Sequence, residues 1–199
     1  MGAFIISRVC RGLHYAHQKT DREGRPLRIV HRDVSLTNIL LDFRGAVKLS
    51  DFGAAKAVTL ATPDEKRTLV GKYGFMSPEQ IKLRGTDHRS DIFSLGLVLY
   101  EVLTGRRVYD VRTREEMIDK IDHQKIQRAN ALNPEIPDDL NTIVMRAIEK
   151  EPINRYQSVV EMGNALEYYM YHDRYGPTNE KLATYLAEVF PEEAKKEVL

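Results

Sequence analysis

The sequence HRDVSLTN at residues 31–38, followed by DFG at 51–53 and SPE at 77–79, is the part of this chain that says most about its fold. The first two segments carry carboxylate and amide side chains, and short apolar runs at 39–41 and 46–49 lie between them. Two such runs joined by a polar turn predict a small β-hairpin. The polar segments therefore flank a predicted hairpin, in a fixed order along the chain.

The composition is that of an ordinary globular chain of about one domain, with 199 residues of which 42% are hydrophobic. Lysine and arginine (30) balance aspartate and glutamate (29), so the net charge of +1 predicts no strong attraction to nucleic acid or to an anionic membrane. The single cysteine, Cys10, allows no intramolecular disulfide and excludes a cysteine-based zinc finger. We therefore expect a cytoplasmic protein without nucleic-acid or membrane partners.

Helical periodicity dominates the remainder of the chain. The spacing of apolar residues predicts helices at residues 5–17, 90–103, 113–126, 138–149 and 158–171. The run at 92–103 is too short to span a bilayer and predicts a buried helix. Polar loops are expected at 18–27 and at 59–74, and a loop as long as the second is usually functional or disordered.

These patterns predict a mainly α fold with a small β-hairpin, in one domain that spans residues 1–175. Residues 176–199 follow the break at Gly176 and Pro177. We expect them to form a further amphipathic helix at 179–190 and a charged tail.

The segments at 31–38, 51–53 and 77–79, in this order and at this spacing, resemble three motifs of protein kinases. These motifs are the catalytic loop, the magnesium-binding motif and the end of the activation segment. The resemblance extends from Phe4 to about His172 and is strongest to bacterial members of the eukaryotic-like (Hanks-type) Ser/Thr kinase family. Each segment alone could occur by chance, but the ordered set with a hairpin between its first two members is specific. The resemblance implies the C-terminal lobe of a kinase, with ATP and Mg²⁺ as cofactors and a protein as substrate.

Phosphoryl transfer needs a positioned hydroxyl, an acceptor for its proton, and divalent cations on the phosphates. The resemblance implies that Asp33, in the same motif as Arg32, accepts the hydroxyl proton. It also implies that Asn38 and Asp51 hold Mg²⁺, which prefers oxygen ligands of this kind. Outside such a motif, the same side chains would be interpreted as turn formers and, for Asp51, as a cap.

Three further residues match positions that support this architecture. Asp91 matches the family aspartate that accepts hydrogen bonds from the catalytic-loop backbone, and it could also cap the helix that it opens. Glu79 and Arg155 match a buried ion pair that links the activation segment to the helical subdomain. Breaking such a pair costs about 3–5 kcal/mol, so we expect Arg155 to matter more for folding than for chemistry.

An arginine before the catalytic aspartate implies the class of kinases whose activation loop can be phosphorylated, because the phosphate would pair with Arg32. Thr68 is the first candidate phosphosite, with Thr62 and Thr59 behind it. The alternative is that these threonines are ordinary solvated loop residues.

The chain departs from the family at one position of the catalytic loop. Ser/Thr kinases have a lysine two residues after the catalytic aspartate, whereas this chain has Ser35, which cannot supply a positive charge to the transferred phosphate. Lys72 stands where a threonine is usual and could make this phosphate contact instead. The alternative is an exposed lysine in a loop.

A larger departure concerns the other lobe. A complete kinase begins with a β-rich lobe that carries a Gly-rich loop, a strand lysine and a helix glutamate. None of these precedes Phe4, and no Gly-x-Gly-x-x-Gly occurs in the 199 residues. The sequence therefore predicts a C-terminal lobe alone, with weak ATP binding and an exposed face that would pack against the other lobe or a partner. Truncation of a longer kinase is the favoured explanation, ahead of a natural one-lobe protein.

Two functions remain in competition. The first is the catalytic lobe of an ATP-dependent Ser/Thr protein kinase that is inactive without its N-terminal lobe. The second is a non-catalytic binding or scaffold module built on the kinase fold. The presence of Asp33, Asn38 and Asp51 favours the first function, whereas the missing lobe favours the second. A small-molecule phosphotransferase is disfavoured, because enzymes of that kind lack the Arg32 motif and the segment from 77 to 91.

Overall fold

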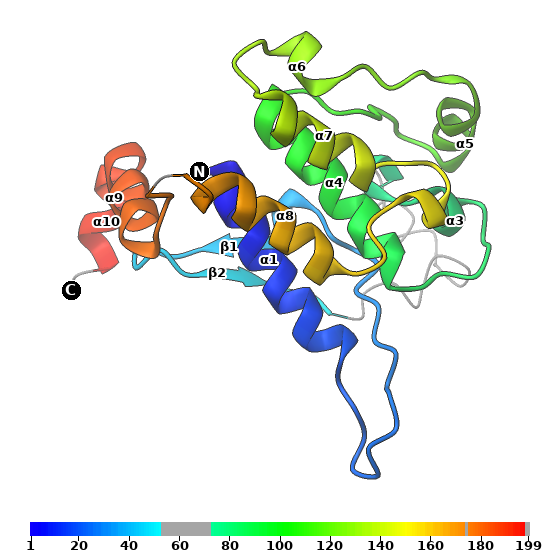
Figure 1. Cartoon of the computed structure of the whole chain (residues 1–199), viewed down its shortest axis with the longest axis horizontal. Helices are drawn as coiled ribbons and strands as arrows, with labels where there is room; N and C mark the ends of the chain where they lie inside the picture. Colours follow the sequence, from blue (N-terminus) through cyan, green and yellow to red (C-terminus); the bar gives the residue numbers. More distant parts are fainter. Residues whose placement is uncertain (53–72, 174, 198–199) are drawn as a thin grey trace.

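The computed structural model describes residues 1–52, 73–173 and 175–197. Helices form most of this part of the chain, and a two-stranded antiparallel sheet accompanies them (Figure 1). The elements in chain order are α1 (Gly2–His17), η1 (Leu36–Asn38), β1 (Ile39–Leu41), β2 (Val47–Leu49), η3 (Tyr73–Phe75), α3 (Pro78–Ile81), α4 (His88–Thr104), α5 (Arg114–His123), α6 (Ala129–Leu132), α7 (Asp138–Ala147), η4 (Pro152–Asn154), α8 (Val159–Tyr171), α9 (Asn179–Val189) and α10 (Pro191–Glu197). The predicted fold class, mainly α with a small hairpin, is confirmed.

Helix α4 lies at the centre of the core. All of its residues from Ser90 to Tyr100 are buried, and it packs against α1, α7 and α8. Its N-cap is Asp87, whose side chain accepts a hydrogen bond from the backbone N–H of Arg89. The suggestion that Asp91 caps this helix is therefore wrong, because the helix begins three residues earlier. No helix in the described ranges combines the length and the apolar character needed to cross a membrane.

The most extensive helix contact joins α1 to α8, and α1 also packs against β2. Helix α1 is amphipathic and buries Phe4, Ile6 and Leu13 completely. Cys10 lies on the same buried face, where burial raises the pKa of its thiol to about 12. The thiol therefore behaves as a small apolar group of the core.

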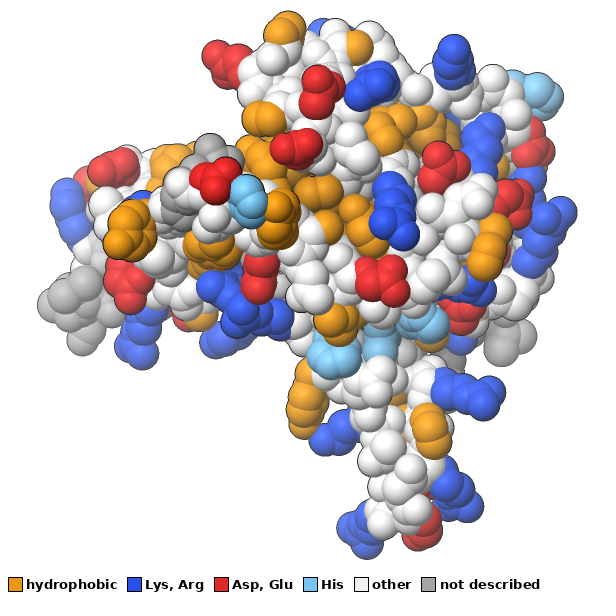
Figure 2. All heavy atoms as spheres, viewed as in Figure 1, with side chains coloured by type: hydrophobic (Ala, Val, Ile, Leu, Met, Phe, Trp, Pro, Cys, Tyr) orange, Lys and Arg blue, Asp and Glu red, His pale blue; other side chains and the backbone are white. Residues whose placement is uncertain are grey.

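The 18–27 segment forms a loop as predicted, and it projects from the body below α1 (Figure 1). Figure 2 shows lysine and arginine side chains along this projection. A single bridge between Thr20 and Pro26 closes the loop, and Gly24 at its tip has a positive φ of 80°. Glycine adopts this backbone conformation without steric cost.

Some predicted boundaries are wrong. The helix predicted at 113–126 ends at His123, because Gln124 turns to an extended conformation and its side chain donates to the Val108 carbonyl. The predicted charged tail contains a short helix, α10. The four-residue helices α3 and α6 were not predicted, since a single turn is too short to show a period. Residues 73–74 of the predicted long loop lie in η3, and the remainder of that loop falls outside the described residues.

Helix α9 is attached at two places. Leu182 and Leu186 are buried in the same apolar core as α1 and α4. At its first residue, the backbone of Asn179 lies directly against Gly45, in the turn between β1 and β2, so α9 lies beside the end of the hairpin (Figure 1). Gly45 has a positive φ of 75° and leaves no room for a Cβ atom at this contact.

We predict that Gly45→Ala destabilises the fold by more than about 2 kcal/mol, because a left-handed alanine is strained and its methyl group would collide with the α9 backbone. The matched control is Gly24→Ala, which has the same kind of φ but nothing within 4 Å of the added Cβ, and should cost only about 1 kcal/mol. Urea denaturation of both variants measures the difference. An equal loss of stability in the two variants would show that the contact between α9 and Gly45 does not restrict the hairpin.

Candidate active site

The backbone of the 31–33 segment is held by a buried carboxylate on α4. Asp91 is completely buried. Its Oδ2 accepts the backbone N–H of His31 (2.9 Å) and its Oδ1 accepts that of Arg32 (2.7 Å). The Nε2 atom of His17, in the last turn of α1, lies 2.7 Å from the same Oδ2. The central helix therefore sets the path of this loop directly.

Arg32 sits in a left-handed conformation, with a φ of 65°. This geometry costs a non-glycine residue about 1–2 kcal/mol. Hydrogen bonds on both sides hold it there: its N–H donates to Asp91, and its carbonyl accepts from Gln80 Nε2 (2.9 Å). Gln80 is itself oriented by a capping box with Ser77 at the start of α3. The 77–81 segment is thereby docked against the 31–38 loop.

The structure brings Asp33 and Asn38 together. Nδ2 of Asn38 donates to the backbone carbonyl of Asp33 (2.7 Å) and to its carboxylate Oδ2 (3.0 Å). Asn38 is buried, with 4% of its surface exposed, and it is the last residue of η1 before β1 begins. Because both Nδ2 protons have partners, the amide presents its oxygen Oδ1 as the remaining ligand atom.

The hairpin brings Asp51 to the same place. Its register pairs Ile39 with Leu49, and the N–H of Ser50 donates to the Asn38 carbonyl (2.9 Å). Ser50 Oγ donates to the Asp51 carboxylate (3.2 Å), and Asp51 has a positive φ of 61°. The exposed carboxylate of Asp51 therefore stands next in the chain to a residue that is hydrogen-bonded to Asn38.

His31 ties these two parts together from inside the core. Its Nδ1 accepts the backbone N–H of Asp33 (3.2 Å), so the proton resides on Nε2, which donates to the Ser50 carbonyl (2.8 Å). The ring also meets Phe52 edge to face, with 4.5 Å between centroids. One buried imidazole thus links the segment that carries Asp33 to the segment that carries Asp51.

The donor set fits Mg²⁺ in the manner expected for a nucleotide-bound cation. Among the described residues, no group of three or more His, Cys, Asp or Glu side chains forms a cage for a metal ion. Asn38 and Asp51 offer one amide oxygen and one carboxylate. Magnesium is commonly held by one or two such groups, with the other ligands coming from phosphates and water.

Glu79 and Arg155 form a buried ion pair, with contacts of 2.7 Å and 2.8 Å. The Arg155 side chain is completely buried, and all of its N–H donors are used, because it also donates to the carbonyls of Glu149, Lys150 and Arg89. Its guanidinium lies over the ring of Phe93. This arginine thus joins α3, α4 and the segment before η4.

The environment of Glu79 favours its charged form. Burial by itself raises the pKa of the carboxyl, but hydrogen bonds from Arg155 and Ser90 outweigh it, so the pKa of Glu79 lies below its ordinary value. The pair therefore contributes stability at pH values above the ordinary carboxyl pKa. This contribution is lost as the pH falls through the lower pKa of the folded state.

We predict that Arg155→Ala lowers the free energy of unfolding by about 3–5 kcal/mol, because it leaves the Glu79 carboxylate buried without its partner. The matched control is Arg128→Ala, which breaks an exposed pair with Asp138 and should cost less than about 1 kcal/mol. Chemical denaturation followed by circular dichroism measures both values. A cooperative transition of Arg155→Ala at the parent midpoint would contradict the prediction.

Four of the predicted site residues lie outside the described residues, and they are Thr59, Thr62, Thr68 and Lys72. Ser35 is buried, and its Oγ lies 3.0 Å from the Thr37 hydroxyl. Sequence reasoning assigned no role to His17 or Gln80. His17 could only have been suspected from its place at the end of a predicted helix, whereas the Ser77-x-x-Gln80 spacing is the pattern of a capping box and could have pointed to Gln80.

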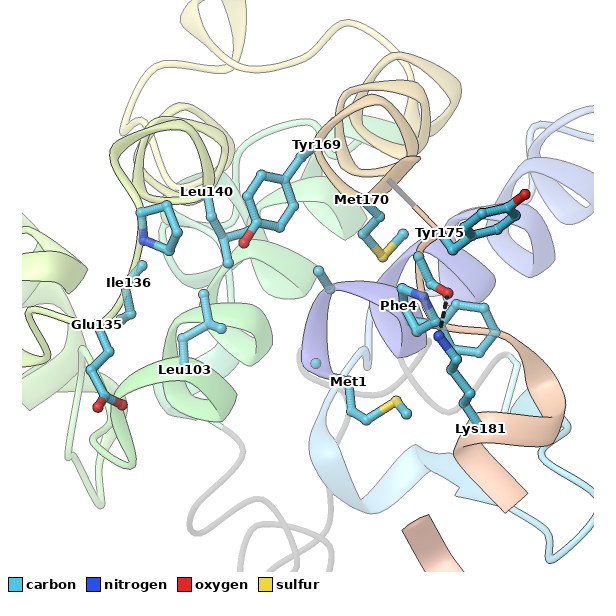
Figure 3. Close-up of a pocket in the computed structure, with 15 residues that line it drawn as sticks. Met1, Phe4, Leu103, Glu135, Ile136, Leu140, Tyr169, Met170, Tyr175 and Lys181 are labelled. Carbon is cyan, nitrogen blue, oxygen red and sulfur yellow. Dashed lines mark hydrogen bonds between the residues drawn. The ribbon is translucent and has the colours of Figure 1, made fainter. Parts of the chain in front are cut away.

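A separate cavity of about 460 Å³ lies between α1, α7 and α8 (Figure 3). Phe4, Leu140 and Met170 line it, and Lys181 at its edge donates to the Gly176 carbonyl (3.2 Å). None of the residues predicted to carry chemistry lines this cavity. It therefore does not belong to the candidate active site.

A helical lobe with a hairpin that joins a clustered Asp–Asn pair to a second aspartate is the architecture of the larger lobe of a phosphotransferase of the kinase class. The protein kinase domain model matches residues 2–167, and the chain belongs to this family. The resemblance to bacterial Hanks-type Ser/Thr kinases inferred from the sequence is confirmed by its relatives.

Three relatives illustrate the range of similarity. The tyrosine-protein kinase MasK of Myxococcus xanthus (strain DK1622) is 34% identical over 189 residues, which make up 95% of this chain and 29% of that protein. The serine/threonine-protein kinase PrkC of Bacillus subtilis (strain 168) is 32% identical over 158 residues, 79% of this chain and 23% of that protein. PknB of Mycobacterium tuberculosis (strain ATCC 25177 / H37Ra), also a serine/threonine-protein kinase, is 34% identical over 164 residues, 79% of this chain and 24% of that protein. The chain thus spans about a quarter of the length of these relatives.

Among solved structures, the crystal structure of the Mycobacterium tuberculosis PknI kinase domain, in a cysteine-to-alanine mutant form, superposes with a TM-score of 0.58. It is 23% identical and covers 83% of this chain and 53% of that chain. This likeness concerns the fold alone.

Proposed function

We propose that the chain is the catalytic lobe of a Ser/Thr protein kinase, which transfers the γ-phosphoryl group of ATP to a protein hydroxyl. The observation that carries this proposal is the arrangement of Asp33, Asn38 and Asp51. The Asn38 amide holds the Asp33 carboxylate, and the hairpin returns the chain so that Ser50, beside Asp51, bonds to Asn38. This is the set of groups that phosphoryl transfer requires.

In this proposal, Asp33 accepts the proton of the attacking hydroxyl as the new P–O bond forms and the bond from the γ-phosphorus to ADP breaks. The amide of Asn38 orients that carboxylate. Asn38 Oδ1 and the Asp51 carboxylate hold Mg²⁺, which neutralises charge on the phosphates. The contacts of His31 and Asp91 fix the position of Asp33 relative to Asp51.

We also propose that activity requires a second lobe that supplies the Gly-rich loop and the lysine for the α- and β-phosphates. Apolar side chains around the hairpin and the end of β2 support this requirement, since Leu40 is 50% exposed and Phe52 is 44% exposed. Leu36 and Leu41 are exposed in the same part of the chain. Without a covering lobe, the isolated chain would bind ATP weakly, because much of the nucleotide would remain in water.

We predict that Asp33→Asn, in the natural polypeptide that contains this segment, lowers the rate of phosphoryl transfer from ATP to protein by about 10²- to 10⁴-fold, because the general base is lost. Radiolabelled ATP with a mixed protein substrate provides the measurement. The control is Asp21→Asn, in the exposed loop after α1, which should leave the rate unchanged.

If the parent protein shows no transfer at all with Mg²⁺ and ATP, the scaffold alternative takes precedence. Analysis of the phosphorylated residues then tests the choice of hydroxyl. PrkC and PknB carry serine/threonine in their names, whereas MasK is named a tyrosine kinase. Phosphoserine or phosphothreonine is expected, and phosphotyrosine alone would correct the proposal to the tyrosine class.

We propose in addition that Lys72 contacts the transferred phosphate in place of the lysine that Ser35 replaces. Lys72→Met should then lower turnover of the complete kinase by about 10-fold or more, because a charge on the transferred group loses its partner. The control is Lys48→Met, on an exposed position of β2. Unchanged turnover of Lys72→Met would contradict the contact.

Thr68 is a separate proposal, as a phosphosite. Mass spectrometry of the active protein tests it.

A further inference from the structure

A second cavity, of about 570 Å³, lies behind the catalytic loop. It opens between the end of α1, the 28–32 segment and the first residues of α4 and α8. Side chains that are cationic or can become so are prominent in its lining, and they are His14, His17, Arg28, Arg32 and His88. Figure 2 shows histidine side chains gathered on this face, where the projecting loop meets the body.

Several of these cationic groups lack a protein partner. Among the described residues, neither the His14 ring nor the Arg28 guanidinium makes a hydrogen bond or an ion pair. The Nε atom of Arg32 is buried without any hydrogen-bond partner. The His14 ring and the Arg28 guanidinium therefore leave donors free for an external acceptor at this cavity.

The nearby acidic groups already have hydrogen-bond partners. The Asp87 carboxylate, which also lines the cavity, binds Arg89 (2.7 Å) and caps α4. Asp91 accepts two backbone N–H groups and lies 2.7 Å from His17 Nε2. Helices α4 and α8 both begin at this cavity, and the partial positive charge of a helix N-terminus adds to that of the arginines.

The backbone of Arg28 adds an independent observation. Its φ of 49° is left-handed, a conformation that glycine adopts freely and arginine adopts at a cost. Backbone strain of this kind is found preferentially at functional sites. Here the side chain lines the cationic cavity.

We infer that this cavity binds a phosphate-type dianion, either as free inorganic phosphate or as the phosphate of a small monoester. The Arg28 guanidinium can donate two parallel N–H groups to phosphate oxygens. The ring of His14 supplies a further donor. The Nε2 of His88 donates to the Gln157 carbonyl (2.8 Å), so His88 donates Nδ1–H to the anion only as the imidazolium. The volume exceeds that of phosphate alone, so a small organic group attached to it would also fit.

The site lies beside the candidate active site and shares Arg32 with the catalytic-loop motif. Asp33, Asn38 and Asp51 do not line the cavity. It is nevertheless connected to the catalytic loop, because His17 contacts both the cavity and Asp91, which holds the loop backbone. The bound anion would therefore lie against Arg32, next to Asp33 in the chain, and one imidazole away from Asp91.

Isothermal titration calorimetry of the 199-residue chain with inorganic phosphate, without Mg²⁺ or nucleotide and at constant ionic strength, tests the inference. Arg28→Gln and His88→Gln should each weaken binding by about tenfold, because each removes a charge-assisted donor to the anion. The matched control is Arg25→Gln, in the same loop, whose guanidinium is paired with Asp21 and Glu23. It should bind as the parent does.

A second variant separates binding from folding. Arg28→Gly should raise the melting temperature, because it relieves the left-handed strain, and should also weaken phosphate binding by about tenfold. A titration with phenyl phosphate distinguishes the two sources of the anion: tighter binding than inorganic phosphate supports a monoester ligand, and equal or weaker binding supports free phosphate. Absence of binding of either compound at about 10 mM, or equal affinity of all the variants, would overturn the inference.

Discussion

The buried carboxylate of Asp91 is the interaction on which the remainder of the structure depends. An isolated charge in a protein core is strongly unfavourable, so it must be surrounded by donors. Asp91 finds these donors in the backbone of His31 and Arg32 and in the ring of His17. Since two of them belong to the loop that carries Asp33, the requirement to satisfy one charge on the central helix also determines the shape of the candidate active site.

Arg155 has the complementary role, as a buried cation whose donors are all used by acceptors from different segments. It connects Glu79 at the end of the 77–79 motif to the region before α8. Gln80, next to Glu79, reaches the carbonyl of Arg32. The two buried charges therefore act on the same loop from two directions, through α4 on one side and through α3 on the other.

Much of the fold could be predicted from periodicity, because helices such as α1, α7 and α8 bury one face and expose the other. The hairpin was also predictable from its two short apolar runs. Boundaries were less predictable. Gln124 leaves the helix because its side chain bonds to a carbonyl sixteen residues away, and α10 forms in a stretch with no apolar stripe. Asp87, and not Asp91, caps α4, since capping depends on the local backbone angles as well as on residue type.

The sequence by itself determined the family and the identity of Asp33, Asn38 and Asp51 as candidates, because these residues lie in short motifs whose spacing is visible along the chain. Only the tertiary structure decided which partners their supporting groups would find. His17 and Asp91 are 74 residues apart, and Glu79 and Arg155 are 76 apart. Buried polar groups must be paired through space, and no periodicity along the chain specifies which distant side chains will be brought within hydrogen-bond distance. The same reason applies to the cavity lined by His14, Arg28 and His88, whose residues share no motif and meet only because the end of α1, the 28–32 segment and the first residues of α4 and α8 lie close together.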